Sequence, residues 1–170
     1  AMAADASQVS AREVFVDAAS SQATLLGAVR SDLTPQSTSG AVDVQAPKTT
    51  DSITNYNLLK ALPVKIYNMV EDDRVLLRLK GMPVAVVDAV YGTGVHGNLK
   101  NNALKVAIYI NKLSDIGTCS IFALDIPSGL GGDLINESLL DVNSVKADYT
   151  ITFHAKKPVH LKKFAKKYCG

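Results

Sequence analysis

The chain has 170 residues, of which 47% are hydrophobic and 20% are charged. This balance supplies enough apolar side chains for a buried core and excludes an intrinsically disordered tail. No apolar run approaches the roughly 18 residues of a membrane span, and no apolar stretch follows a basic start as in a secretory signal. The two cysteines, Cys119 and Cys169, are too few for a disulfide scaffold or a zinc site and suit a reducing, cytoplasmic location.

The net charge of +2 is unevenly distributed along the chain. Residues 1–47 contain five acids, two arginines and no lysine, whereas six lysines and no acid lie within residues 156–170. This change predicts an Ala/Ser-rich head over 1–47 and a main domain over 48–170. The lysine-rich end could attract phosphate or nucleic acid, and the alternative interpretation is a solvated helix face.

The first half of the chain contains residues with helical spacing and several residues typical of turns. Ser10 and Glu13 form a capping box, which predicts a helix over residues 11–30. The elements expected next are a loop over 31–50 with at most a short strand at 41–44, a helix from Thr50 or Asp51 to about Lys60, a strand at 64–67 and a helix over 71–80.

Two short apolar runs in the second half each end in an acid. They are Pro83–Asp88 and Ser120–Asp125, and such runs are typical of strands buried on both faces of a parallel sheet. The spacing predicts a helix over 101–113, a third strand at 147–153 and a last basic helix over 159–168. Alternating strands and helices indicate βαβ units and a doubly wound α/β sheet.

A glycine-rich segment follows the first of these strands. Gly92, Gly94 and Gly97 allow tight turns and let a ligand approach backbone N–H groups, and the following helix could assist an anion. An ordinary strand-to-helix connection would look the same. The segment matches neither the dinucleotide-binding fingerprint nor a Walker motif.

The second strand leads into Asp125-Ile-Pro-Ser128-Gly129-Leu130. An aspartate that closes a parallel strand stands where ligands bind, and it can act as an acid, a base or a hydrogen-bond acceptor. Ser128 adds a hydroxyl and a carbonyl group. The alternative is that Asp125 or Ser128 only caps a turn.

Taken together, these motifs resemble the YjeF N-terminal domain family, the NAD(P)HX epimerases of nicotinamide-nucleotide repair. The ordered motifs that carry the resemblance are Val87-Asp-Ala89 with Gly92-Thr-Gly94 and Gly97, then Asp125–Leu130, then Ala147-Asp-Tyr-Thr-Ile-Thr-Phe153, then Lys157-Pro158 with Leu161, and finally Cys169-Gly170. The resemblance implies an α/β fold, a Rossmann-like three-layer αβα arrangement with a mostly parallel sheet.

The resemblance also implies a function and a set of site residues. The substrate would be hydrated NADH or NADPH, whose R and S epimers are interconverted for a partner dehydratase, and a homodimer is expected. Asp88 and Ser128 would be ligands of a potassium ion, and Asp125 would contact the substrate. Because epimerisation needs the C–O bond to break and reform, we expect Asp125 to be the general acid and base. The substrate would be bound by Asp125 together with Gly92, Thr93, Gly94, Val95, His96, Gly97 and Asn98.

One expected motif is missing. The family carries an Asn- and Gly-rich loop, N-N-G-G-D-G, after its first strand, and nothing in residues 1–83 resembles it. A second hypothesis is therefore a non-catalytic family member that serves as a scaffold for dimerisation, partner binding or RNA binding, with lysines at its end contacting RNA phosphate. A generic Rossmann-type nucleotide binder is a third.

Overall fold

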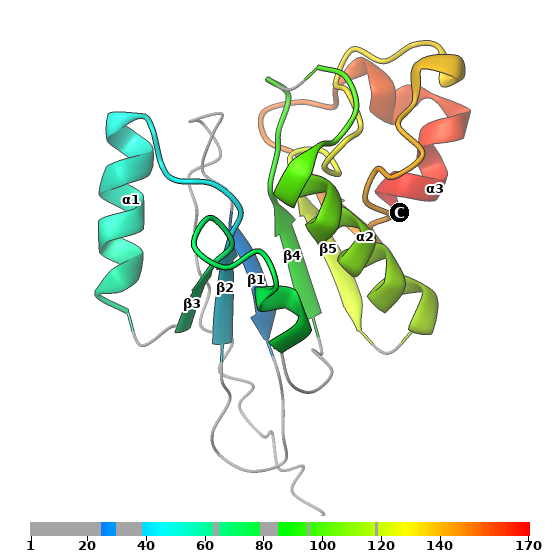
Figure 1. The fold of residues 1–170 in the computed structure, drawn as a ribbon. Coiled ribbons are helices and arrows are strands. Elements are labelled where there is room, and N and C mark those ends of the chain that lie inside the picture. The colour runs from blue at the N-terminus through cyan, green and yellow to red at the C-terminus, as the bar shows by residue number, and fades with distance from the viewer. Residues whose placement is uncertain (1–24, 30–38, 63–64, 79–84, 95, 118) are drawn as a thin grey trace, which may run out of the picture.

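The structure is a computed structural model, and it describes residues 25–29, 39–62, 65–78, 85–94, 96–117 and 119–170. Within these ranges one sheet has the strand order β3-β2-β1-β4-β5-β6 (Figure 1). The strands are β1 (Leu25–Val29), β2 (Ser39–Asp43), β3 (Lys65–Asn68), β4 (Ala85–Ala89), β5 (Ser120–Leu124) and β6 (Tyr149–Ile151). The α-helices are α1 (Thr50–Lys60), α2 (Asn101–Ile116) and α3 (Lys166–Cys169).

The strand directions bring several strand ends to one edge of the sheet. β2 pairs parallel with β3, and β4, β5 and β6 pair parallel with one another. β1 runs antiparallel to both of its neighbours, β2 and β4, so those two strands point the same way. Every strand except β1 therefore ends at the same edge, which is where α/β sheets bind ligands. The predicted Rossmann-like α/β fold with a mostly parallel sheet is confirmed.

The main core lies between α2 and the sheet. In Figure 1, α2 crosses in front of β4 and β5. It buries one apolar stripe, made of Ala103, Val106, Ala107, Ile110 and Leu113, against residues such as Val86 and Ile121. The helix ends at Gly117, whose φ of 72° is the left-handed conformation that stops a helix.

A second, smaller apolar cluster fixes the lysine-rich end of the chain. Ile126 and Leu130, from the segment after β5, pack with Val159, Ala165 and Tyr168. Lys156, Lys163, Lys166 and Lys167 are exposed. The lysine-rich end is thus anchored through its apolar residues, and it is built from short turns of 3₁₀ helix at 158–161 and 163–165 followed by α3. The single helix expected over 159–168 was therefore wrong.

Most of the predicted elements after residue 40 are present. The strands near 64–67, 83–88, 120–125 and 147–153 correspond to β3, β4, β5 and β6, and the short strand near 41–44 corresponds to β2. The helix from residue 50 is α1, although its N-cap is Thr49, which exchanges hydrogen bonds with Ser52. The helix expected over 71–80 was wrong, because 75–78 form a 3₁₀ turn; residues 79–84 lie outside the described part.

The helix predicted over 11–30 was wrong at residues 25–29, which form β1. Each side of this strand pairs with a neighbour, and tertiary pairing of this kind overrides local helix periodicity. Gly27, near the middle of the strand, also disfavours a helix. The capping box at Ser10 and the rest of that prediction lie outside the described residues.

Two strands of the sheet come from the expected head. β1 pairs with β4 and β2 pairs with β3, so these strands share a sheet with residues beyond 47. For the other residues of 1–47 the expected domain boundary stays a prediction. In the described part of the chain, no helix combines the length and the apolar character needed to cross a membrane.

Candidate functional site

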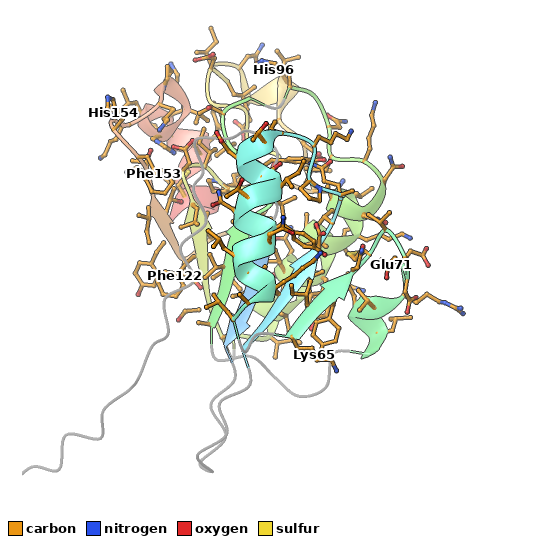
Figure 2. All side chains as sticks on the ribbon, turned by 90° about the vertical axis from the view of Figure 1, so that its left-hand side faces the viewer. Lys65, Glu71, His96, Phe122, Phe153 and His154 are labelled. Carbon is orange, nitrogen blue, oxygen red and sulfur yellow. The ribbon has the colours of Figure 1, made fainter. Side chains whose placement is uncertain are left out.

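The candidate site lies at the edge of the sheet where β4, β5 and β6 end. Asp88 is the last residue but one of β4, Asp125 directly follows β5 and Thr152 directly follows β6. His96 and His154 mark this end of the molecule in Figure 2, and Lys65, the first residue of β3, lies at the opposite end. Both acids that close the predicted apolar strands thus lie at the expected edge of the sheet.

Asp88 is fully buried and is held by Ser128. The Ser128 hydroxyl donates to Asp88 Oδ1 at 2.6 Å, and the Ser128 backbone N–H donates to Oδ2 at 2.8 Å. The Tyr91 N–H donates to the Ser128 Oγ at 2.9 Å. These bonds bring together the predicted pair Asp88 and Ser128 and tie the segment after β4 to the segment after β5.

Burial raises the pKa of the Asp88 carboxyl, although the hydrogen bonds from Ser128 and Val90 act in the opposite direction. Among the described residues, no lysine or arginine forms an ion pair with this carboxylate. A buried carboxylate is costly unless it is hydrogen-bonded, paired or bound to a cation. Asp88 is therefore surrounded by hydrogen-bonding groups of the segments after β4 and β5, and no described lysine or arginine is paired with it.

Asp125 adopts an unusual backbone conformation. Its φ is 68°, in the left-handed region where residues other than glycine are uncommon. Its N–H donates to the Ile151 carbonyl of β6 at 2.8 Å, which fixes the turn after β5. Left-handed conformations at non-glycine residues concentrate at functional sites, and here the turn places an almost buried carboxylate beside the end of β6.

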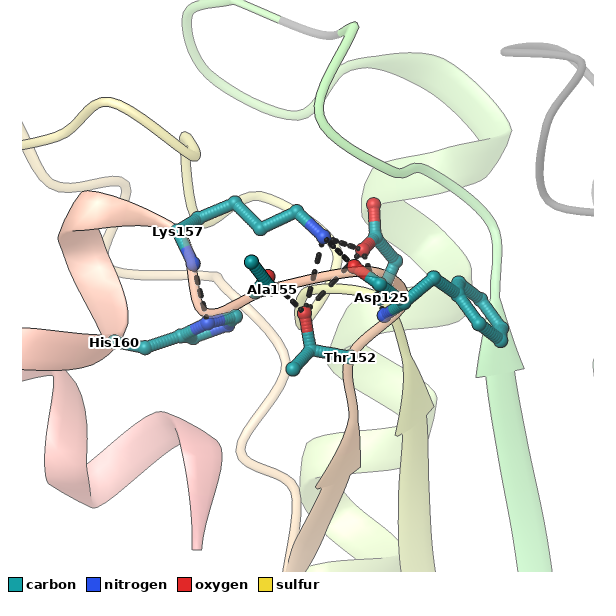
Figure 3. A network of polar contacts seen from close by, with 6 residues as sticks. Asp125, Thr152, Ala155, Lys157 and His160 are labelled. Carbon is teal, nitrogen blue, oxygen red and sulfur yellow. Dashed lines mark hydrogen bonds and ion pairs between the residues drawn. The ribbon is translucent and has the colours of Figure 1, made fainter.

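The carboxylate of Asp125 forms an ion pair with Lys157, as Figure 3 shows. The Phe153 N–H donates to the same oxygen, Oδ1, at 3.4 Å. The Lys157 Nζ also donates to the Thr152 hydroxyl at 3.0 Å and to the Phe153 carbonyl at 2.7 Å. The segment after β6 therefore encloses one side of Asp125.

The glycine-rich segment encloses the other side. A Cβ atom added to Gly92 would lie 3.4 Å from Asp125 Oδ2. A Cβ added to Gly132 would lie 3.4 Å from the Thr93 methyl carbon and 3.7 Å from Lys157 Cγ. Glycine at these positions lets the segments after β4, β5 and β6 approach closely.

The two predicted acids are thus connected in a crossed manner. Asp88, at the end of β4, is bound by Ser128 from the segment after β5, and Asp125, after β5, faces Gly92 from the segment after β4. The segment after β5 thus holds Asp88 by hydrogen bonds, and the segment after β4 lies beside Asp125.

The rest of the predicted substrate segment is open to solvent. Thr93, Gly94, His96, Gly97 and Asn98 are exposed, and Val95 lies outside the described residues. A Cβ added to Gly97 would meet no atom within 4 Å. The segment is fixed at its far end, where the Leu99 N–H donates to the buried Asp141 carboxylate at 2.6 Å.

Lys157 and Thr152 are site residues that the sequence reasoning did not identify. A signal for Thr152 existed, because it follows the third strand as Asp125 follows the second. Lys157 was quoted only as part of the Lys157-Pro158 motif and of the lysine cluster, without a role in the site. Its neighbour His160 accepts the Lys157 N–H through Nδ1 at 3.1 Å, and burial together with the positive charge of Lys157 lowers the pKa of His160.

In the ranges that the structure describes, no group of three or more His, Cys, Asp or Glu side chains could hold a metal ion. The connection from β2 to α1, at residues 44–49, contains neither glycine nor asparagine. The first residue of this connection, Val44, belongs to the core.

Comparisons with known proteins support the family. The family model described as YjeF-related protein N-terminus matches residues 36–159. An NAD(P)H-hydrate epimerase of Cenarchaeum symbiosum is 36% identical over 75 residues, covering 44% of this chain and 32% of the relative. An NAD(P)H-hydrate epimerase of Nitrosopumilus maritimus is 35% identical over 78 residues, again with 44% and 32% covered.

Two further matches extend this result. The bifunctional NAD(P)H-hydrate repair enzyme Nnr of Archaeoglobus fulgidus is 36% identical over 85 residues, covering 50% of this chain and 16% of the relative. The crystal structure of yeast ynu0, YNL200c, matches with a TM-score of 0.55 at 18% identity, covering 70% of this chain and 48% of the yeast chain. The chain therefore spans less than half the length of each of these relatives.

The family model covers most of the chain, including β2, β4, β5, β6 and both strand-end acids of the site. The yeast structure shares the fold. The chain belongs to the family of proteins related to the YjeF N-terminus.

Proposed function

We propose that this chain is an isomerase that interconverts the R and S epimers of hydrated NADH and NADPH. The observation that carries the proposal is the crossed arrangement of Asp88 with Ser128 and of Asp125 with Gly92. It puts an almost buried carboxylate beside a glycine-rich segment at the ligand-binding edge of the sheet. Relatives named NAD(P)H-hydrate epimerase, 35–36% identical to this chain over 75–78 residues, support the proposal.

Asp125 is the proposed general acid and base. Epimerisation breaks the C–O bond at the hydrated ring carbon, and the departing hydroxyl leaves as water after it takes a proton from the carboxyl group. The ring nitrogen lone pair stabilises the resulting cation by forming a C=N bond. Water then adds from the other face and returns its proton to the carboxylate, so one group performs both transfers.

The glycine-rich segment is the proposed substrate contact. Asp125 faces Gly92, while Gly97 leaves open space above its backbone. Backbone N–H groups in such a segment can approach the anionic groups of a dinucleotide closely. The proposed contacts are Gly92, Thr93, Gly94, Val95, His96, Gly97 and Asn98.

We propose that Asp88 and Ser128 hold a potassium ion. Their oxygens fit a hard cation in kind, and the buried Asp88 carboxylate has no cationic partner among the described side chains. When bound, the ion would supply positive charge near the anionic substrate. The residues of this chain that it would help to order are Tyr91 and Gly92, through the bond from Tyr91 to Ser128.

The wider setting of the activity is also a proposal. A dehydratase is the expected functional partner, and a relative that is a bifunctional repair enzyme supports this pairing. The free thiols of Cys119 and Cys169 suit the cytoplasm. A homodimer stays a prediction from the resemblance.

The test is to purify one epimer of hydrated NADPH and to follow the appearance of the other by chromatography. We expect the wild-type chain with potassium to exceed the spontaneous rate, and Asp125→Asn to lose about 10²-fold or more of the acceleration. Asp115→Asn is the matched control, because Asp115 is an exposed acid at the end of α2. Exchange at the spontaneous rate in the wild type would refute the activity and favour the scaffold hypothesis, whose separate test is salt-dependent RNA binding.

A further inference from the structure

Lys157 differs from the other lysines at the end of the chain because its charge is turned inward. Its side chain is 19% exposed, and its Nζ meets three oxygens, from Asp125, Thr152 and Phe153. A lysine ammonium group has three N–H donors, so all of them are used. Lys156, its neighbour in the chain, is exposed and has no such contacts among the described residues.

Contacts of both the backbone and the side chain fix the position of Lys157. Its backbone N–H donates to His160 Nδ1 at 3.1 Å, and Pro158 begins the 3₁₀ turn that follows. Its stem passes near Gly132, where an added Cβ would lie 3.7 Å from Lys157 Cγ. The Thr152 hydroxyl, which accepts from Nζ, donates to the Ala155 carbonyl at 3.2 Å. The ammonium group is therefore held in place before any ligand binds.

The two oxygens of Asp125 consequently have different surroundings. Oδ1 faces Lys157, the Phe153 N–H and the Thr152 hydroxyl. Oδ2 faces Gly92, where an added Cβ would lie 3.4 Å away. Figure 3 shows one oxygen of the carboxylate directed at Lys157 and the other pointing away from it.

We propose that Lys157 is a positioning residue that binds Asp125 Oδ1 and thereby directs Oδ2 toward the substrate as the oxygen that exchanges the proton. Its positive charge also compensates the carboxylate each time the proton leaves for the departing hydroxyl. This proposal rests on the proposed epimerase function. It adds a role for Lys157 and assigns separate roles to the two oxygens of Asp125.

The test compares Lys157→Met, Lys157→Arg and Thr152→Val with the control Lys156→Met, which removes the same charge from the adjacent, exposed position. We expect Lys157→Met to lower kcat by roughly 10²-fold, as misplacement of a reacting group does, with little change in KM. Lys157→Arg should recover part of this loss, and Thr152→Val should lower kcat by a smaller factor. Lys156→Met should match the wild type.

Folding is measured for every variant by circular dichroism and thermal unfolding. Unchanged kcat in folded Lys157→Met would overturn the proposal, and so would a loss in Lys157→Met that Lys157→Arg does not relieve at all. If Lys157→Met does not fold, the folded Thr152→Val variant decides: a lowered kcat at unchanged KM supports the proposal, and a wild-type kcat contradicts it.

A second readout separates this proposal from the epimerase function. The ¹³Cγ resonance of Asp125 is recorded at neutral pH in the wild type and the variants. We expect it to shift in Lys157→Met and to stay in place in Lys156→Met. If the wild type shows no epimerase activity but the resonance shifts, the function fails while the positioning of Asp125 stands; an unmoved resonance overturns the positioning itself.

Discussion

Two buried carboxylates lie on opposite sides of β1, and their surroundings differ. Asp88, at the end of β4, accepts a hydroxyl and a backbone N–H from Ser128, 40 residues further along the chain. Asp43, at the end of β2, accepts a hydrogen bond from the N–H of Gln45, two residues away. Burial raises the pKa of Asp43 to about 6.

The contrast shows what makes the part of this edge from β4 to β6 a candidate site. From β4 to β6, side chains at the strand ends are bound by neighbouring segments, which orients them for a ligand. At β2, the connection to α1 supplies a core residue, Val44, and no glycine. A buried acid alone is a cost to stability, whereas a buried acid that is held by a second segment can be a functional group.

The largest expected effect is at Asp88. Asp88→Ala leaves the hydroxyl and the N–H of Ser128 without their acceptors in a buried place, and each buried unsatisfied donor costs about 1–3 kcal/mol. We expect the free energy of unfolding to fall by about 3 kcal/mol, measured by urea denaturation. Asp43→Ala, the matched change on the other side of β1, should cost clearly less, and equal losses would remove the distinction between the two acids.

Gly129 tests how tightly the segment after β5 is held. Its φ is 93°, and an added Cβ would lie 2.9 Å from both Leu99 Cδ1 and the Ser144 Oγ. Gly129→Ala should therefore cost about 2–3 kcal/mol through backbone strain and overpacking. Gly97→Ala is the control. Gly97 has a φ of 85°, but an added Cβ would meet no atom within 4 Å, so this substitution adds backbone strain without overpacking. If both variants unfold at the same urea concentration, the segment is not held by close packing.

Asp43→Asn should increase the free energy of unfolding, whereas the two preceding changes lower it. The pKa of Asp43 rises from 3.8 to about 6 on folding, so the folded state binds the proton more tightly, and stability falls as pH rises through this window. The neutral amide avoids that cost, and we expect a gain of about 2 kcal/mol at pH 7.5. The gain should disappear as the pH falls below the unfolded-state pKa of 3.8. A gain that is independent of pH would show that charge is not the cause.

The second half of the fold could be predicted from the sequence because its signals are local. The runs that end at Asp88 and Asp125 are short and mostly apolar, and α2 has a helical apolar stripe and a glycine, Gly117, at its end. Strand ends then place both acids at one edge by the rules of parallel sheets. The family resemblance named Asp88 and Ser128 together as potassium ligands, and the hydrogen bonds between them were not predicted.

The missed features depend on contacts that are distant in sequence. β1 lies in a stretch with helical spacing, and its pairing with β2 and β4 decided its conformation. Six lysines near the end of the chain have the same charge, and only the packing around Gly132 and Pro158 selects Lys157 to face Asp125. The sequence carries no periodic signal for such a choice.

The most direct test of the central claim is the rate at which a single purified epimer of hydrated NADPH converts in the presence of Asp125→Asn and of Asp43→Asn. Both variants replace a mostly buried strand-end acid with its amide. The account predicts wild-type exchange with Asp43→Asn and exchange near the spontaneous rate with Asp125→Asn. Wild-type exchange in Asp125→Asn would contradict it.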